Sequence, residues 1–161
     1  MKKEVEKLLQ YVQKPARYIG GELNAVVKDK DKVDIRYAFC FPDTYEIGMS
    51  HLGMKILYGL VNDREDSWCE RVFAPDNDME EQLRKNNVPL FALESGDYIK
   101  DFDMIGFTLQ YELSYTNVLN MLNLAQIPLK SSDRENLTPL ICVGGPCACN
   151  PEPITDFVDI V

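Results

Sequence analysis

VDIRYAFCF at residues 33–41, followed at once by PDTYEIGMSHLGMKILYGLV at residues 42–61, decides the fold. The first segment begins with alternating apolar and polar residues, becomes continuously apolar and stops at Pro42, which is typical of a central strand in a parallel sheet. From Gly48 onward apolar residues recur every three or four positions, which predicts an amphipathic helix ending near Asn62. The pair therefore predicts the first half of a strand–helix–strand unit.

The same alternation of strand and helix recurs along the rest of the chain. Apolar runs and apolar periodicity predict further strands at 68–73, 90–93, 103–109, 137–143 and 157–161, and helices over 76–87 and from residue 114. Such alternation indicates right-handed crossovers on a parallel sheet. We therefore expect an α/β, flavodoxin-like (Rossmann-like) domain of three layers with a mainly parallel five-stranded sheet, and 90–93 as a short extra strand besides these five.

The length of 161 residues, 45% of them hydrophobic, suits one domain with a single core. Residues 1–14 carry a helical apolar pattern that Pro15 ends, and a turn-rich and then charged stretch follows. We divide the chain into an N-terminal helix and lead-in at 1–32 and the flavodoxin-like domain at 33–161. Because the sequence stops inside a predicted strand, we expect it to be a fragment of a longer protein.

The formal net charge of −9 argues against nucleic-acid binding, which depends on clustered Lys and Arg. No apolar run reaches the ~18 residues of a membrane helix. The charged start also lacks the apolar segment of a secretory signal. We therefore expect a cytoplasmic protein with neither a nucleic acid nor a membrane as partner.

The five cysteines do not indicate a disulfide framework or a metal centre. Cys40, Cys69 and Cys142 each fall in a predicted strand, where a reduced thiol packs as a small apolar group. Cys147 and Cys149 form a C-x-C pair, but two thiolates do not complete a tetrahedral site. We predict no metal site.

In open parallel sheets, ligands bind beyond the carboxyl ends of the strands where the strand order reverses. That rule selects the three loops at 42–51, 108–112 and 144–146. Their polar, aromatic and glycine residues are the candidate cofactor-binding positions, namely Asp43, Tyr45, Glu46, Ser50, His51, Gln110, Tyr111, Glu112, Gly144 and Gly145.

Each of these positions also has a structural role open to it. Asp43 or Ser50 can cap the following helix, with Tyr45 packed under it. Glu112 suits the positive end of the next helix, and His51 in a first helical turn is more typical of a structural role than of catalysis. The glycine pair permits either the close approach of a flat ligand or a tight turn.

Several common functions are disfavoured by the absence of their motifs. The chain has no G-x-G-x-x-G and no G-x-x-x-x-G-K-[ST], so neither a dinucleotide nor a nucleoside triphosphate is favoured. The loop at 42–51 is acidic and aromatic rather than suited to a mononucleotide phosphate, and no Asp ends the strand at 103–109 as a phosphoacceptor would require. No Ser/His/Asp or Cys/His arrangement is evident, and we assign no catalytic residue.

Six separate blocks, in order, resemble one protein family. They are KPARYIGGE at 14–22, FPDTYEIGMSHLG at 41–53, ERVFAP at 70–75, LQYEL at 109–113, GGP at 144–146 and NPEP at 150–153. Together they resemble the N-terminal region of an uncharacterised bacterial radical S-adenosylmethionine (SAM) family, described as Fe–S oxidoreductases. The resemblance runs from about residue 8 to the end of the chain.

The resemblance implies a cobalamin-binding-like domain that precedes a radical SAM barrel, the C-terminal domain of the same polypeptide and its expected partner. It implies cobalamin as a candidate cofactor. The cluster motif C-x-x-x-C-x-x-C does not occur here, so we expect this chain to bind no [4Fe–4S] cluster, to cleave no SAM and to have no catalysis of its own. The D-x-H-x-x-G motif for an axial histidine is also absent around His51. The alternative function is a structural domain that docks on the barrel without a ligand.

Overall fold

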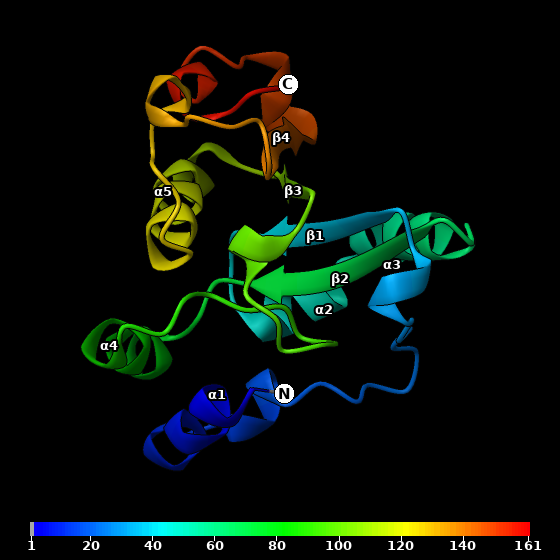
Figure 1. The fold of residues 1–161 in the computed structure, drawn as a ribbon. Coiled ribbons are helices and arrows are strands. Elements are labelled where there is room, and N and C mark those ends of the chain that lie inside the picture. The colour runs from blue at the N-terminus through cyan, green and yellow to red at the C-terminus, as the bar shows by residue number, and fades with distance from the viewer. Residues whose placement is uncertain (1) are drawn as a thin grey trace.

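The computed structural model describes residues 2–161 and has a parallel four-stranded sheet at its centre (Figure 1). The strands are β1 (Ile35–Phe41), β2 (Ser67–Phe73), β3 (Met104–Thr108) and β4 (Leu140–Gly144). Their order is β2-β1-β3-β4, so the central strand β1 pairs with β2 on one side and with β3 on the other. The predicted α/β class with a parallel, Rossmann-like sheet is confirmed.

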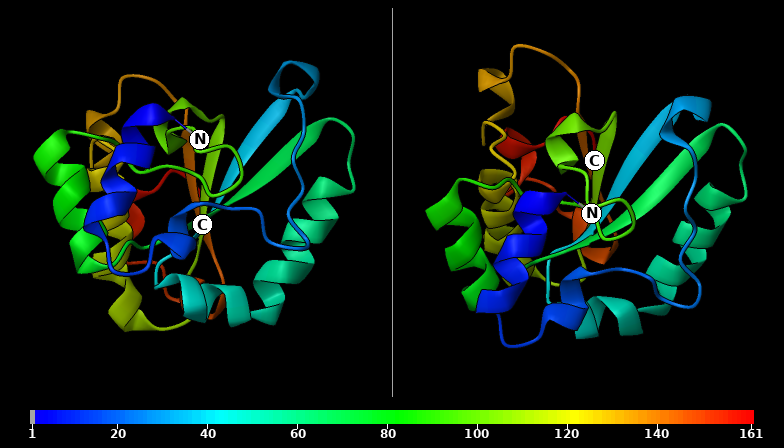
Figure 2. Two further views of the ribbon diagram at one scale, coloured as in Figure 1. Left: turned by 90° about the horizontal axis from the view of Figure 1, so that it is seen from below. Right: turned by 60° about the horizontal axis from the view of Figure 1, so that its bottom comes forward.

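Helices cover both sides of the sheet (Figure 2). The helices are α1 (Lys3–Leu8), α2 (Tyr45–Ser50), α3 (Leu52–Asn62), α4 (Asn77–Asn86) and α5 (Tyr115–Leu124). Residues of α4 and α5 pack with Ala38, Cys40 and Ile105 in the larger core. Residues of α3 pack with Phe39 and Phe41 in a smaller core on the opposite side. We call these the α4–α5 side and the α3 side.

One helix was predicted after β1, but the chain forms two. His51 interrupts them with extended backbone (φ −79°, ψ 113°), and its Nδ1 accepts a hydrogen bond of 3.1 Å from the backbone N–H of Met54. The ring therefore acts as the N-cap of α3. A periodicity argument misses this break because apolar residues lie at helical spacing on both sides of it.

Two of the predicted strands do not form as expected. Residues 90–93 make a single antiparallel bridge, from Phe91 to Tyr98, and instead run along the outer edge of β2, where the Leu93 N–H donates to the carbonyl of Arg71 at 2.9 Å. The predicted fifth strand at 157–161 is reduced to one parallel bridge between Cys142 and Ile160. Among residues 2–161 the sheet therefore has four strands, not five.

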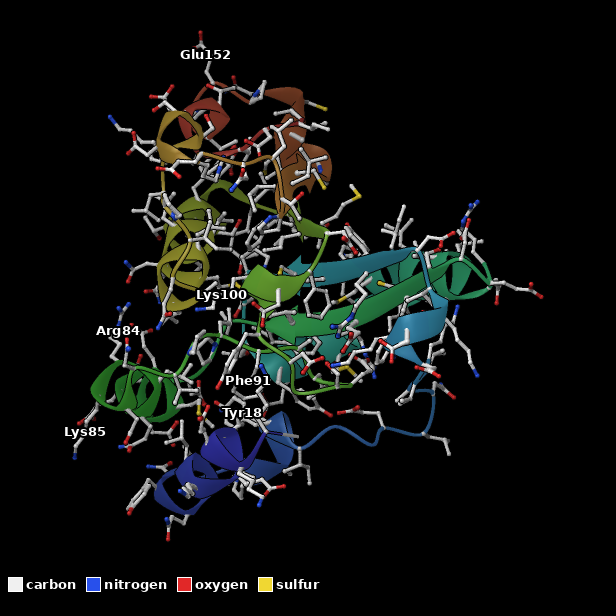
Figure 3. The ribbon with its side chains drawn as sticks, in the orientation of Figure 1. Tyr18, Arg84, Lys85, Phe91, Lys100 and Glu152 are labelled. Atoms are coloured by element: carbon white, nitrogen blue, oxygen red, sulfur yellow. The ribbon has the colours of Figure 1, made fainter. Side chains whose placement is uncertain are left out.

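The N-terminal helix is shorter than predicted, since α1 ends at Leu8 and a 3-10 turn follows at Leu9–Tyr11. Val5 and Leu8 are buried in the larger core beside α4. Further on, Tyr18 and Phe91 line the same small pocket (Figure 3). The lead-in then passes α3 and β2, where the Tyr58 hydroxyl and the Trp68 indole bond the backbone of residue 26. Residues 2–32 thus contribute directly to the core.

Two buried ion pairs fix the outer strand β2 to its neighbours. Arg36 of β1 bonds Glu70 at 2.5 Å, and Arg71 bonds Glu94 at 2.6 Å; both glutamate side chains are fully buried. The Arg71 N–H also donates to the Glu94 carboxylate at 2.7 Å. Because a buried carboxylate is costly without its partner, these pairs hold residues 94 and 95 against the edge of β2.

We predict that Arg71→Leu lowers the free energy of unfolding by about 3–5 kcal/mol, because it leaves Glu94 buried without its guanidinium partner. Arg64→Leu is the matched control, since Arg64 pairs with Asp66 on the surface and its loss should leave stability nearly unchanged. Urea denaturation of both variants measures this. Equal losses in the two variants would contradict a special role for the buried pair.

Candidate functional site

The loops that follow β1, β3 and β4 meet at the carboxyl edge, by which we mean the edge of the sheet where its strands end. The chain passes from β1 to β2 on one side and later returns to β3 on the other, so the order reverses between β1 and β3. Loops diverge at such a point and leave room for a ligand. Direct hydrogen bonds between the three loops show that they lie together.

Asp43 connects the ends of three strands. Its carbonyl accepts a hydrogen bond of 3.0 Å from the N–H of Ala74, just after β2. One carboxylate oxygen accepts from the N–H of Thr44 at 2.7 Å, and the other accepts from the hydroxyl of Tyr111, after β3. Asn117 of α5 adds a bond of 2.9 Å to the carbonyl of Pro42. Asp43 therefore does not cap α2 through its side chain but joins the loops.

The contact with Asp43 changes the acidity of Tyr111. The hydrogen bond to the carboxylate, with smaller effects from burial and from the negative charge, raises the pKa of Tyr111 to about 12. A phenol that keeps its proton can go on donating to Asp43 throughout the physiological range. The ring itself stays exposed at the rim of the carboxyl edge.

The loops after β3 and β4 are joined through their backbones. The Leu109 N–H donates to the carbonyl of Gly144 at 2.7 Å, and the Cys147 N–H donates to the carbonyl of Leu109 at 3.1 Å. Gly145 has φ 101°, and a Cβ there would lie 2.7 Å from the Leu109 carbonyl oxygen. A Cβ at Gly144 would instead meet no atom within 4 Å. Gly145 thus serves the loop–loop contact, whereas Gly144 leaves backbone exposed at the edge.

A hollow of about 330 Å³ with both polar and apolar lining lies beside these two loops. Gln110 contributes to its wall, with its side-chain amide donating to the hydroxyl of Thr108 at 2.6 Å. The other residues that line it include Glu112, Tyr115, Cys147, Cys149 and Asn150. Its size would admit part of a cofactor or a small polar substrate.

Four of the predicted positions have partners elsewhere. The Tyr45 hydroxyl donates to Glu22 at 3.1 Å, and Glu46 pairs with Arg17 at 2.7 Å. Ser50 donates back to the carbonyl of Glu46, and His51 caps α3 as described above. The structure therefore brings Asp43, Gln110, Tyr111, Glu112, Gly144 and Gly145 together at the carboxyl edge. Of the other four, Tyr45 and Glu46 bond the lead-in, Ser50 bonds back within α2 and His51 caps α3.

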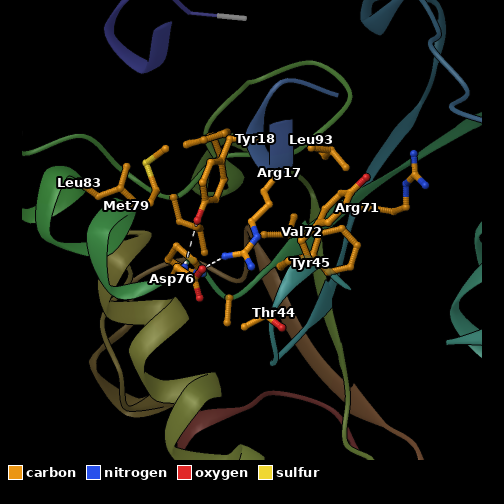
Figure 4. Close-up of a pocket in the computed structure, with 15 residues that line it drawn as sticks. Arg17, Tyr18, Thr44, Tyr45, Arg71, Val72, Asp76, Met79, Leu83 and Leu93 are labelled. Atoms are coloured by element: carbon orange, nitrogen blue, oxygen red, sulfur yellow. Dashed lines mark hydrogen bonds and ion pairs between the residues drawn. The ribbon is translucent and has the colours of Figure 1, made fainter. Parts of the chain in front are cut away.

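The sequence analysis did not identify the lead-in residues that contact the segment at 42–51, among them Arg17, which pairs with Glu46. Figure 4 shows Arg17 paired with Asp76, whose N–H donates to the Tyr18 hydroxyl at 3.1 Å. The pocket that Arg17, Tyr18 and Asp76 line has a volume of only about 20 Å³, which is roughly the space for one water molecule. We therefore regard it as a packed contact rather than a ligand site. The sequence feature that indicates this contact is the block at 14–22, which contains Arg17 and Tyr18 and which we interpreted only as part of the family resemblance.

Two kinds of feature are absent from residues 2–161. No group of three or more His, Cys, Asp or Glu side chains is arranged to hold a metal ion. Within the same range, no helix has the length and apolar character needed to cross a membrane.

Residues 53–161, about two thirds of the chain, match the family model for the N-terminal region of radical SAM proteins. The chain belongs to this family. The match starts within α3 and includes β2, β3, β4 and two of the three loops of the carboxyl edge.

One curated relative extends the comparison. Over 124 residues the chain is 28% identical to the uncharacterized protein MJ0966 of Methanocaldococcus jannaschii. The aligned part is 76% of this chain but only 22% of that protein. This radical SAM N-terminal chain thus spans about a fifth of the length of the relative. No solved structure matches this chain.

We predict that Gly145→Ala destabilises the protein by about 1–3 kcal/mol, because a side chain there is strained by the positive φ and overlaps the Leu109 carbonyl. Gly144→Ala is the control and should change stability by less than about 0.5 kcal/mol, since its Cβ points into open space. Urea unfolding of both variants tests this. A stable Gly145→Ala protein would contradict the close contact of the two loops.

We also predict that Asp43→Asn lowers the pKa of Tyr111 from about 12 toward its ordinary value of 10.0, because the amide no longer favours the protonated phenol. The stabilisation linked to this bond is present below the ordinary pKa and is lost as the pH rises through about 12. The measurement is an ultraviolet titration of tyrosine ionisation, with Tyr111→Phe in each background to isolate the signal. An unchanged pKa would contradict the Asp43 contact.

Proposed function

We propose that the chain is the N-terminal accessory domain of a longer cytoplasmic radical SAM enzyme, and that its carboxyl edge presents cobalamin or a substrate to the barrel of the same polypeptide. The observation that carries the proposal is the meeting of three loops at the switch point of a sheet in a chain of this family. The five free cysteines agree with a reducing compartment.

The carboxyl edge fits a flat ligand such as cobalamin in two respects. The exposed backbone at Gly144 allows a macrocycle to approach closely, because no side chain stands over it. Gln110 and Glu112 border the adjoining hollow with an amide and a carboxylate, which suit the amide groups around a corrin ring. When bound, cobalamin supplies the reactive cobalt centre, and the protein contributes binding and orientation.

The single histidine of the chain, His51, already has a structural role in this arrangement. His51 uses Nδ1 to cap α3, and its ring packs against Phe41 with centroids 5.2 Å apart. The absence of the D-x-H-x-x-G motif agrees with this. The role of the chain would be to bind and orient the corrin through residues such as Gln110, Glu112 and Gly144, while Asp43 and Tyr111 hold the loops together.

A second function, docking on the barrel without a ligand, is favoured by the exposed apolar side chains of α2 and α3. Ile47, Leu52, Ile56 and Leu60 are each at least half exposed. Apolar residues gathered on one surface of a soluble domain are typical of an interface. The domain could dock on the barrel in this way whether or not the carboxyl edge binds cobalamin.

We predict that the protein retains hydroxocobalamin through gel filtration, measured as corrin absorbance in the protein peak. Gly144→Trp should abolish retention, because the indole would occupy the open space over the end of β4. Gly59→Trp is the matched control, since a Cβ there also meets no atom within 4 Å but lies on α3, and it should retain corrin like the unaltered protein.

Failure of the unaltered protein to retain corrin would remove the cofactor function and leave the docking function. Equal retention by Gly144→Trp and Gly59→Trp would show that corrin binds elsewhere. Determining the coding sequence beyond Val161 tests the parent enzyme separately, because a C-x-x-x-C-x-x-C motif there would identify a radical SAM barrel.

A further inference from the structure

A second hollow, of about 340 Å³, lies on the α3 side of the sheet, where the lead-in, α2, α3 and the outer strand β2 meet. We call it the lead-in hollow. Its wall is mainly apolar and includes Val26, Met49, Met54 and Tyr58. It shares no lining residue with the hollow beside Gln110, so it is a separate feature of the molecule.

Arg71 of β2 places a charged group in this apolar wall. Its side chain is only 7% exposed, and it bonds Glu94 through Nε at 2.6 Å and Glu22 through Nη2 at 3.2 Å. Within residues 2–161, Nη1 has only the sulfur of Met49 as a partner, at 3.3 Å. A thioether is a weak acceptor, whereas buried donors normally bond an oxygen. Because Arg71 and Met49 both line the lead-in hollow, Nη1 is a buried donor available to an acceptor that enters it.

The contacts around Arg71 hold this donor in place. Its Cζ lies 4.7 Å from the centroid of the Tyr58 ring, which is a cation–π contact. The Tyr58 hydroxyl in turn accepts a hydrogen bond of 2.7 Å from the N–H of Val26, and the Glu94 carboxylate is fully buried. A donor that is fixed before binding loses little conformational entropy when a ligand arrives.

The charges around the lead-in hollow favour an uncharged acceptor. Arg71 already has two carboxylate partners, and one of them, Glu22, lines the hollow itself. A ligand carboxylate would bring a third negative charge to the same guanidinium. Lys55 also lines the hollow but is exposed, so water and salt screen its attraction for an anion. A carbonyl oxygen bonds Nη1 without the repulsion from Glu22.

We infer that the lead-in hollow binds a small, uncharged molecule with an aromatic ring and a carbonyl group. The carbonyl oxygen accepts from Nη1 of Arg71, and the ring contacts Met49 and Met54, because thioether sulfurs pack favourably against aromatic rings and adapt to their shape. The volume of about 340 Å³ lies within the range of about 300–1,000 Å³ that is usual for small-molecule pockets. The inference goes beyond the proposed function and does not depend on it.

The test is a titration with phenylacetamide, read by NMR of protein that carries ¹³C in its methionine methyl groups. The signals of Met49 and Met54, assigned with Met49→Leu and Met54→Leu, should shift with a Kd of about 1 mM or lower. The signal of Met121, which is fully buried in the larger core, should not move.

Two further probes test the chemical class. Ethylbenzene lacks the carbonyl and should bind at least about tenfold more weakly, because Nη1 gains no acceptor. Phenylacetate has nearly the same shape as phenylacetamide but carries a charge, and it should bind at least about tenfold more weakly because of Glu22 and Glu94.

Gly59→Trp is the variant that blocks the lead-in hollow. Gly59 lines the hollow, and a Cβ there meets no atom within 4 Å, so the indole has room to fill it. This variant should weaken phenylacetamide binding by at least about tenfold. Gly144→Trp, at the carboxyl edge, is the matched control and should leave the affinity unchanged. An unmoved Met121 signal in both variants verifies that the fold is retained.

Four results would overturn the inference. Unmoved Met49 and Met54 signals would show that no such molecule binds, and equal affinities of Gly59→Trp and Gly144→Trp would show that it binds elsewhere. Ethylbenzene binding as tightly as phenylacetamide would refute the hydrogen bond to Arg71, and phenylacetate doing so would refute an uncharged ligand. Corrin retention is expected to respond to Gly144→Trp and not to Gly59→Trp, so failure of the proposed function is distinguished from failure of this inference.

Discussion

The pairing of β1 with strands on both sides is the constraint on which the rest of the structure depends. Phe39 pairs with Arg71 of β2 and with Gly106 of β3 in parallel register. Each parallel pair requires a crossover, and the two crossovers leave β1 in opposite directions. The loop after β1 therefore lies where the strand order reverses, which places Asp43 within reach of the chain after β2 and of Tyr111 after β3.

Sequence patterns predicted the elements that bury a continuous apolar run. The strands at 35–41, 67–73 and 104–108 and the helices α4 and α5 lie close to their expected positions. The strands that were predicted but do not form share a physical cause. Their local sequence is compatible with a strand, but tertiary contacts determine the structure that these residues adopt. Residues 90–93 have strand-like composition but are held against β2 by the contacts of Arg71 and Glu94, and no local periodicity encodes that pairing.

The candidate site was predictable at the level of loops but not of side chains. Because parallel strands end at the same edge of a sheet, the sequence alone predicts that the three loops lie together. It could not tell that Tyr45 turns toward Glu22 or that Glu46 turns toward Arg17, because both partners lie more than 20 residues earlier in the chain. The prediction that Asp43 caps the following helix was wrong for the same reason, because its side chain accepts a hydrogen bond from Tyr111, 68 positions away.

These long-range contacts give the lead-in a role in the geometry of the carboxyl edge. Arg17 bonds both Glu46 in α2 and Asp76 at the start of α4, and Glu22 bonds Tyr45 and Arg71. Val5 and Leu8 anchor the same segment in the core, and full burial of such side chains stabilises by about 1.5–3 kcal/mol each. The lead-in therefore packs in the core and also bonds α2, which directly follows the Asp43 loop. Displacing the lead-in would allow Asp43 and its partners to move, although no residue at the carboxyl edge itself would have changed.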